Sequence, residues 1–377
     1  MGREWWRSPW TILGVVVAVP VLAFTIPALM APRRPAGVTR PTPPPATPGA
    51  VAEACGPGSI AADSAAPPPS PTLQAPLPTP RVGERIFYDS QQNDVLVLGG
   101  SDFTTGRPLS DAWTLDGAGW QSEASPDMAP GPVVQDPSSG RLTALDGSRS
   151  SGDGLQTWSW NGAAWTAAAD LPLAGGWEVL GLEPLRTQLV LVAGNAARTA
   201  TETWTWAAGG SWTLRHPVNE LPAGASAPLL AADPTHDRIV ALLDPHTPSG
   251  ETTQAWAWGG SSWTFVTSTT RFGLDPYSES LAPDPQTGAV VLFLHPGGSA
   301  ACTWALSGST WEELSADSPD VDTSPDGTTL LADTGIGRVI LVGGDWPDGN
   351  PLDVLWVLNG SRWTAEPASV LGTGPPA

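Results

Sequence analysis

The side chains best suited to bind a ligand lie in polar segments that separate short apolar runs of the chain. Their guanidinium, carboxylate and imidazole groups could hydrogen-bond a saccharide or a peptide, and their two indole rings could stack on a sugar. Connecting segments of this kind often carry function, although charged side chains in them can also serve solubility alone. The candidate ligand-binding residues are Trp177, Trp346, Arg107, Arg149, Asp153, Arg198, His246, Asp345 and Asp348.

Three histidines, His216, His246 and His295, fall in three different segments of this kind. Three imidazoles can bind zinc, but these lack the close spacing of a metal motif, so we interpret them as solvated side chains. The sequence also contains no G-x-S-x-G elbow, no H-x-x-x-H pair and no phosphate-binding loop. We therefore predict no catalytic residue, no metal site and no cofactor.

The two cysteines, Cys55 and Cys302, have no metal-motif spacing and give no disulfide framework. Cys55 lies shortly before the repeats described below, in a segment that could fold back towards Cys302. We hypothesise a single disulfide between them, and the alternative is two free thiols.

Tryptophan is unusually frequent, with 20 Trp against two Tyr and six Phe. Trp160, Trp206 and Trp258 are replaced by leucine at the equivalent positions of other repeats. A packing position accepts that exchange, whereas a stacking site for a sugar does not. We therefore interpret the fifteen tryptophans of the repeats as packing residues. Apart from three near the N-terminus, only Trp177 and Trp346 lie outside the repeats, and these are the aromatic candidates.

A tryptophan that closes a hairpin recurs every 45 to 52 residues. The pattern is a Trp, an apolar residue two positions on, a Gly-containing turn and the closing Trp, as in QTWSWNGAAW at 156–165. A second hairpin precedes each copy, as in RIFYDSQQNDVLVLGG at 85–100, and its first strand ends in Asp or Glu, which suits a type I turn. The closing residues are Trp120, Trp165, Trp212, Trp263, Trp311 and Trp363.

Four strands per repeat, six repeats and no helical pattern between them predict an all-β, six-bladed β-propeller. The first and last repeats are complete, so the ring should close between two whole blades. Connections in a four-stranded meander alternate between two faces. The loops that join strands two and three therefore share one face with those that join successive blades. These loops are the longer ones, and we expect this long-loop face to bind the ligand.

The hairpin pattern W-x-[WL]-x-x-G-x-x-W, with Gly99-Gly100 and Gly343-Gly344 after the second strand, resembles the kelch repeat, especially the bacterial galactose-oxidase-like group. The resemblance covers about Val82 to Pro367, and the double glycine is reduced or lost in the middle blades. A copper-radical oxidase would need a Tyr linked to Cys, a second Tyr and two His. The tyrosines and cysteines here do not match that set, so the resemblance implies a kelch-like propeller without the oxidase site.

An uncharged segment of 22 residues, from Trp10 to Ala31, precedes the repeats. A helix of this length reaches about 33 Å, enough for the hydrocarbon core of a bilayer. We predict a transmembrane helix or signal anchor after a tail of residues 1–9, and a cleaved signal peptide is the alternative. Residues 32–80, rich in Pro, Ala and Thr, predict a disordered stalk. Residues 81–367 are the predicted propeller and residues 368–377 a flexible tail.

The formal net charge is −20 and the chain contains no lysine. Such a chain repels phosphate backbones, so we predict no nucleic-acid partner. The stalk favours a propeller on the extracytoplasmic, cell-surface side, although arginines after the apolar segment favour a cytoplasmic one. We predict a membrane-tethered, non-enzymatic binding or scaffolding module for protein or glycan ligands. The alternative is a carbohydrate-active or oxidative enzyme with its site on the long-loop face.

Overall fold

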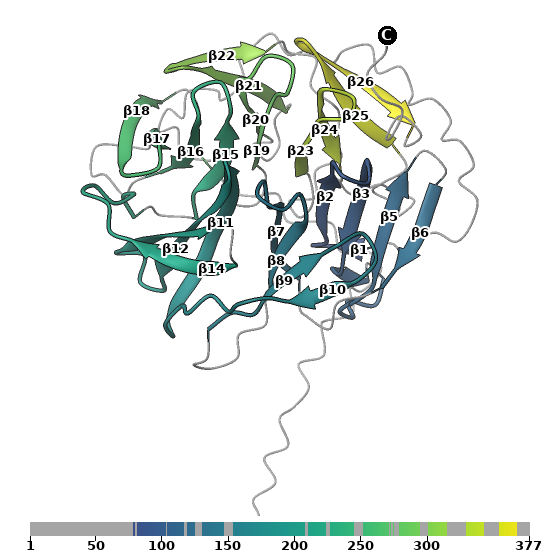
Figure 1. The fold of residues 1–377 in the computed structure, drawn as a ribbon. Coiled ribbons are helices and arrows are strands. Elements are labelled where there is room, and N and C mark those ends of the chain that lie inside the picture. Colours follow the sequence, from purple (N-terminus) through teal and green to yellow (C-terminus); the bar gives the residue numbers. More distant parts are fainter. Residues whose placement is uncertain are drawn as a thin grey trace, which may run out of the picture. The chain divides into compact units, whose positions relative to one another are not determined.

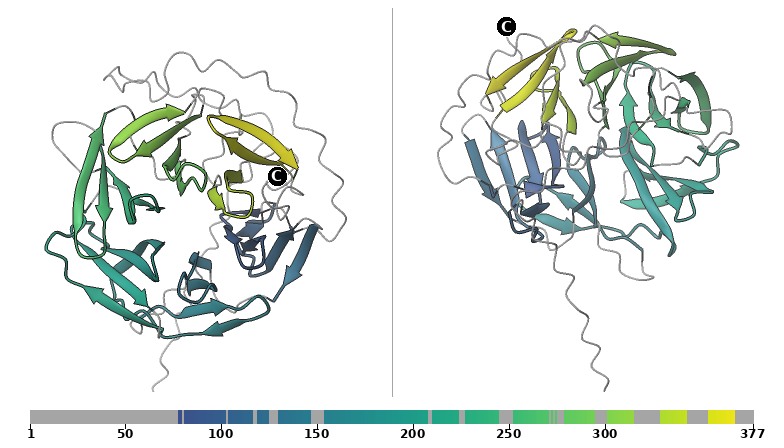
Figure 2. Two further views of the ribbon diagram at one scale, coloured as in Figure 1. Left: turned by 45° about the horizontal axis from the view of Figure 1, so that its top comes forward. Right: turned by 180° about the vertical axis from the view of Figure 1, so that it is seen from behind.

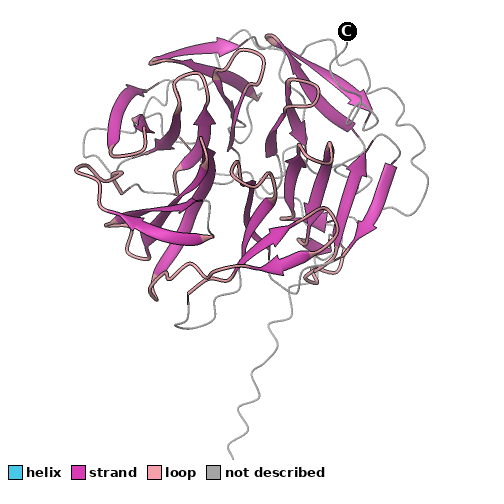
Figure 3. Cartoon of the chain, in the orientation of Figure 1, coloured by secondary structure: helices cyan, strands magenta, loops and turns pink. Residues whose placement is uncertain are grey.

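The computed structural model describes only part of the chain, and all of it belongs to the unit Ala50–Ala377. The described residues are 78–79, 81–102, 104–116, 119–124, 130–146, 154–207, 210–223, 227–244, 252–270, 272, 274, 279–294, 301–314, 329–342 and 354–367. They form strands, turns and loops, and none of them is helical (Figure 3). Among them no helix is long and apolar enough to cross a membrane. The predicted membrane helix, both tails and almost all of the stalk lie outside the described residues.

Six antiparallel sheets of four strands each form the blades (Figure 1). Blade 1 consists of β2 (Arg85–Asp89), β3 (Asp94–Leu98), β5 (Ala112–Asp116) and β6 (Gly119–Glu123). Blade 2 consists of β7 (Pro130–Gln135), β8 (Leu142–Asp146), β9 (Thr157–Trp160) and β10 (Trp165–Ala167). Blade 3 consists of β11 (Trp177–Leu185), β12 (Gln188–Asn195), β13 (Thr201–Ala207) and β14 (Ser211–Arg215). Blade 4 consists of β15 (Leu229–Asp233), β16 (Arg238–Leu243), β17 (Thr253–Trp258) and β18 (Trp263–Thr269). Blade 5 consists of β19 (Glu279–Pro283), β20 (Val290–Leu294), β21 (Cys302–Ser307) and β22 (Thr310–Leu314). Blade 6 consists of β23 (Thr329–Asp333), β24 (Arg338–Val342), β25 (Val354–Asn359) and β26 (Arg362–Pro367).

The first strands of the six blades surround the centre of the ring (Figure 2). Each of β2, β7, β11, β15 and β19 contacts the first strand of the next blade, and β23 contacts β2. Each four-stranded sheet is made only of strands of its own blade, so the ring closes between two whole blades. The predicted all-β, six-bladed propeller is therefore confirmed.

The second strands supply the core because both of their faces are covered by neighbouring blades. In β3, Val95 and Val97 pack against blade 6, whereas Leu96 and Leu98 pack against blade 2. Successive side chains of a strand point to opposite faces, which is why a continuous run of Val and Leu suits this place. The described residues contain one hydrophobic cluster at each of the six blade interfaces.

A buried aspartate follows or ends the first strand in five blades, and its carboxylate caps the tight turn to the second strand. Oδ1 of Asp136, for example, accepts a hydrogen bond from the backbone N–H of Ser138 at 2.9 Å. Such side-chain caps satisfy the turn's backbone donors and fix its conformation. The five aspartates are Asp89, Asp136, Asp233, Asp284 and Asp333.

Blade 3 differs from the sequence-based expectation at this turn. Glu183 and Pro184 were expected to begin the turn, but β11 continues through both of them to Leu185. Pro184 pairs with Leu189 there without breaking the sheet, because β11 is an edge strand and needs no donor on its outer side. The turn is then made by Arg186, at a φ of 56°, and Thr187.

Three closing tryptophans join their blade to the preceding one through the indole N–H. Trp212 donates to Thr157 at 2.8 Å, and Trp263 and Trp363 make the same bond at 2.9 Å to Thr203 and Thr303. These threonines directly precede the first Trp of the repeat hairpin. Blades 1 and 6 have Ala112 and Leu355 at that position, and the indole N–H groups that face them, on Trp165 and Trp120, have no partner among the described residues.

The chain enters the propeller at a buried arginine. Arg81 forms two parallel hydrogen bonds with the carboxylate of Asp111, at 2.7 and 2.8 Å, and also donates to the Gly99 carbonyl at 2.9 Å. Its neighbour Val82 pairs with Ser101 in the short ladder between β1 (Arg81–Val82) and β4 (Ser101–Asp102). A bidentate, buried pair holds a guanidinium in one orientation. The entering segment is thereby fixed to the long-loop face of blade 1.

Candidate functional site

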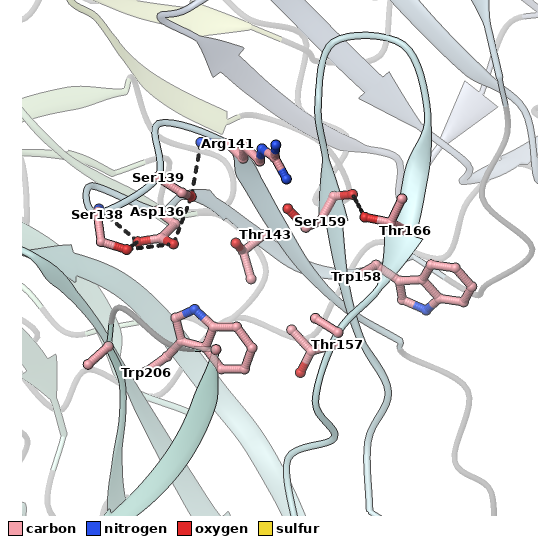
Figure 4. A pocket seen from close by; sticks show the side chains of 13 residues that line it. Asp136, Ser138, Ser139, Arg141, Thr143, Thr157, Trp158, Ser159, Thr166 and Trp206 are labelled. Atoms are coloured by element: carbon pink, nitrogen blue, oxygen red, sulfur yellow. Dashed lines mark hydrogen bonds between the residues drawn. The ribbon is translucent and has the colours of Figure 1, made fainter.

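A groove of about 380 Å³ lies between blades 2 and 3 (Figure 4). It falls in the range of about 300–1,000 Å³ that small-molecule sites occupy. Blade 2 supplies its tight turn and its last three strands, and blade 3 supplies the turn between β13 and β14. The lining residues are Asp136, Ser138, Ser139, Arg141, Thr143, Thr157, Trp158, Ser159, Thr166, Ala168, Trp206, Ala207 and Gly210.

Hydroxyl groups form a row across one wall of the groove. Thr143 of β8 is paired with Ser159 of β9, and Ser159 is paired with Thr166 of β10. Directly paired residues of adjacent strands share a face of the sheet, so these three hydroxyls lie side by side. Thr166 Oγ1 donates to the Ser159 carbonyl at 3.2 Å, and the Thr166 side chain is exposed.

Among the described residues that line the groove, the only acid and the only base, Asp136 and Arg141, belong to the tight turn of blade 2. The carboxylate of Asp136 is satisfied within its own turn, by the hydroxyls of Ser138 and Ser139, each at 2.8 Å. The guanidinium of Arg141 has no hydrogen-bond or ion-pair partner among the residues that the structure describes. In Figure 4, Thr143 lies between Arg141 and the opposite wall.

The opposite wall is an edge of the Trp206 indole. This ring is 6% exposed and packs against Trp212, with 5.3 Å between the ring centroids. Gly210 lies against this ring, since a Cβ added at Gly210 would be 3.5 Å from it. The φ of 71° at this position also favours glycine. Trp158 points away from Trp206 in Figure 4 and packs at the interface of blades 1 and 2. These contacts agree with the packing role predicted for the repeat tryptophans.

Of the nine residues nominated from the sequence, three are described, and none of these lines the groove. Trp177 is the first residue of β11, pairs with Asn195 and packs half-buried against the core between blades 2 and 3. Arg107 and Arg198 are exposed on long loops of blades 1 and 3. The remaining candidates lie outside the described residues: Arg149, Asp153, His246, Asp345, Trp346 and Asp348.

Cys302 is buried in β21 and is disulfide-bonded. Cys55 lies outside the described residues, so the pairing of these two cysteines stays a prediction. Tyr88 packs against the core between blades 6 and 1. Within the described ranges, no group of three or more His, Cys, Asp or Glu could hold a metal ion.

The groove escaped the sequence analysis because its parts come from two repeats. Each part alone resembles an ordinary feature of the repeat, namely a capped turn, a strand and a packing tryptophan. One signal was available in the sequence. Six positions separate Trp206 from the closing Trp212, whereas the other five blades have five at this place, so the turn of blade 3 is one residue longer.

No family model matches the chain, and none of the curated proteins is similar to it in sequence. Solved structures do match. The fucose-specific lectin of Aleuria aurantia has a TM-score of 0.53 at 12% identity, over 80% of this chain and 99% of the lectin. A structure named YjhT has a TM-score of 0.51 at 10% identity, over 77% of this chain and 98% of that one. At such low identity these likenesses show a shared propeller fold.

Proposed function

We propose that this propeller is a glycan-binding module whose site is the groove between blades 2 and 3. The observation that carries the proposal is the row of hydroxyls formed by Thr143, Ser159 and Thr166, which lies in a groove that also holds a free guanidinium and an indole edge. A saccharide presents hydroxyls in fixed directions together with apolar C–H faces. A groove with closely spaced hydrogen-bonding groups and an aromatic wall complements both.

Similar folds with known ligands support the choice of ligand class. The Aleuria aurantia lectin has been solved in complex with Fucalpha1-6GlcNAc, in a structure with a TM-score of 0.53 and 11% identity to this chain. A second complex of the same lectin, with alpha-methyl-L-fucoside, has a TM-score of 0.50. A six-bladed propeller is thus a scaffold that can present a sugar site. None of the lectin's residues is carried over to this chain.

The proposed setting is a kelch-like propeller held on the outer surface of a membrane. Its support is the apolar segment 10–31, the Pro-rich segment 32–80 and the kelch-like hairpin pattern. Arg81 and the end of β26 both belong to the long-loop face of the propeller, and the tight turn of blade 2 lies on the other face. Protease treatment of intact cells tests this setting, since an exported propeller is digested and an internal one survives until lysis.

A glycan array probed with the purified full chain tests the proposed function. The test variant is Thr166→Val, which removes one hydroxyl of the row. The matched control is Thr264→Val in blade 4, because Thr264 is also exposed, also follows a closing Trp, and also donates to a strand carbonyl, that of Ala257, at 3.3 Å. We expect saturable binding that weakens about tenfold in Thr166→Val and is unchanged in Thr264→Val. Equal binding by both variants would place the ligand elsewhere.

A further inference from the structure

Arginine recurs at the start of the second strand in several blades, and in blade 4 it closes the groove to the next blade. Nε of Arg238 donates to Oδ2 of Asp233 at 2.8 Å, and Nη2 donates to the carbonyl of Gly308 in blade 5 at 2.6 Å. Arg141 is the equivalent residue of blade 2. The backbone N–H of Asp136 donates to the carbonyl of Arg141, and Asp233 and Arg238 are paired at the same place in blade 4. The same residue type is thus bonded in one groove and unbonded in the other.

Two sequence differences accompany the unlike behaviour of the two arginines. In blade 2 the hydroxyl of Ser139 bonds Oδ2 of Asp136, the oxygen that the arginine bonds in blade 4. The corresponding residue of blade 4 is His236, whose ring Nδ1 lies 3.0 Å from both carboxylate oxygens of Asp233, and Oδ2 there also accepts from Arg238. Across the groove, the turn of blade 3 is one residue longer than that of blade 5. Among the described residues, the guanidinium of Arg141 bonds neither the carboxylate of its own turn nor a carbonyl of blade 3.

The groove between blades 3 and 4 is closed in another way. Arg186 donates to Asp237 at 2.6 Å and reaches the carbonyl of Gly259 in blade 4 at 3.4 Å. Two of the neighbouring interfaces thus use an arginine to bridge the blades, and the interface of blades 2 and 3 leaves its arginine facing the open groove.

We infer that Arg141 binds a carboxylate of the ligand, so that the saccharide bound between blades 2 and 3 is an acidic one. The inference rests on the proposed glycan-binding function and specifies its ligand. Guanidinium and carboxylate match as two parallel hydrogen bonds, a charge-assisted contact that is stronger than a bond to a neutral hydroxyl. Arg141 is exposed, so water solvates its charge in the free protein, and a carboxylate of the ligand would take the place of that water.

The acidity of the whole chain does not oppose this contact at close range. The described part of the groove lining carries one acid and one base, and the acid, Asp136, already accepts hydrogen bonds from Ser138 and Ser139. Charges farther away than about 8 Å are largely screened at physiological ionic strength. At this distance the attraction between Arg141 and a bound anion would therefore outweigh the repulsion by the distant acidic side chains.

Matched pairs of methyl glycosides test the inference on the full chain. Each pair compares a hexuronate with its parent hexose, in the gluco, galacto and manno series, so that only the carboxylate changes. Titrations followed by ligand-detected NMR compare the wild type with Arg141→Gln and with Arg85→Gln. The second variant removes an exposed arginine of blade 1 that lies outside the groove.

In at least one series we expect the uronate to bind about tenfold more tightly than the hexose in the wild type and in Arg85→Gln. In Arg141→Gln the two should bind alike. A preference that survives in Arg141→Gln, no preference in any series, or no uronate binding would overturn the inference. Methyl α-L-fucoside is included as a neutral probe. If it binds in a Thr166-dependent way while the uronates do not, the inference fails and the proposed function stands.

Discussion

Arg81 and most of the turn aspartates of this propeller are held by specific partners, and Glu183 is an exception to this pattern. Arg81, whose side chain is 1% exposed, is paired with Asp111. The turn aspartates accept hydrogen bonds from their own turns, as Asp284 does from the Gln286 N–H at 2.9 Å. Glu183 differs, because burial raises the pKa of its carboxyl to about 8, and the N–H of Ala232 offsets this only in part. A buried carboxyl without a cationic partner favours its protonated form.

This exception predicts a pH dependence of stability. The folded state holds the Glu183 proton up to a pH of about 8, whereas a solvated glutamate releases it near 4.5. Between these values the unfolded state binds fewer protons, so the free energy of unfolding falls as the pH rises, by up to about 1.4 kcal/mol per pH unit. Glu183→Gln, which cannot ionise, should flatten this part of the profile. Urea unfolding from pH 4.5 to 8.5 measures it, and parallel profiles for both proteins would contradict the explanation.

The contacts between neighbouring blades differ from one interface to the next. The apolar clusters between blades use the same residue types around the ring, whereas the indole-to-threonine bond is present only where a threonine precedes the repeat hairpin. An indole N–H buried without an acceptor costs free energy. The interfaces that carry this bond should therefore resist blade separation more strongly than those that lack it.

A pair of variants at the interface of blades 3 and 4 tests this. Thr203 and Trp263 are both fully buried and their hydrogen bond lies outside the groove. Thr203→Val keeps the shape and removes the acceptor, so we expect a loss of about 1–2 kcal/mol in the free energy of unfolding. Thr203→Ser keeps the acceptor and should lose clearly less. Equal losses in chemical denaturation would mean that the methyl group, rather than the bond, stabilises the interface.

The strand pattern could be predicted at the scale of these elements, and the site could not. Closing tryptophans and runs such as VVLFL at 290–294 record the packing that every blade needs, so the sequence repeats them. The groove depends instead on which partner Asp136 takes and on one extra residue in the turn after Trp206. Those choices become visible only when two blades are placed together. Trp177 packs half-buried against the core between blades 2 and 3, and the binding role suggested by its position outside the repeat stays a prediction.

The whole ring has two unlike faces. The chain enters at Arg81 on the long-loop face, and the last strand, β26, ends on that face as well. The tight turns lie on the other face, where Ser138, Ser139 and Arg141 border the groove. Closure between two whole blades keeps blades 2 and 3, which form the site, clear of the join.

The most direct test of the account asks whether a saccharide contacts this groove. The full chain with ¹⁵N-labelled tryptophan gives one indole signal for each ring, and Trp206→Phe identifies the Trp206 signal. Titration with the sugar that binds best on the array should shift the Trp206 signal saturably. It should leave the signal of Trp258, the equivalent residue of blade 4, in place. Saturable binding that shifts other indole signals and leaves that of Trp206 unchanged would contradict the central claim.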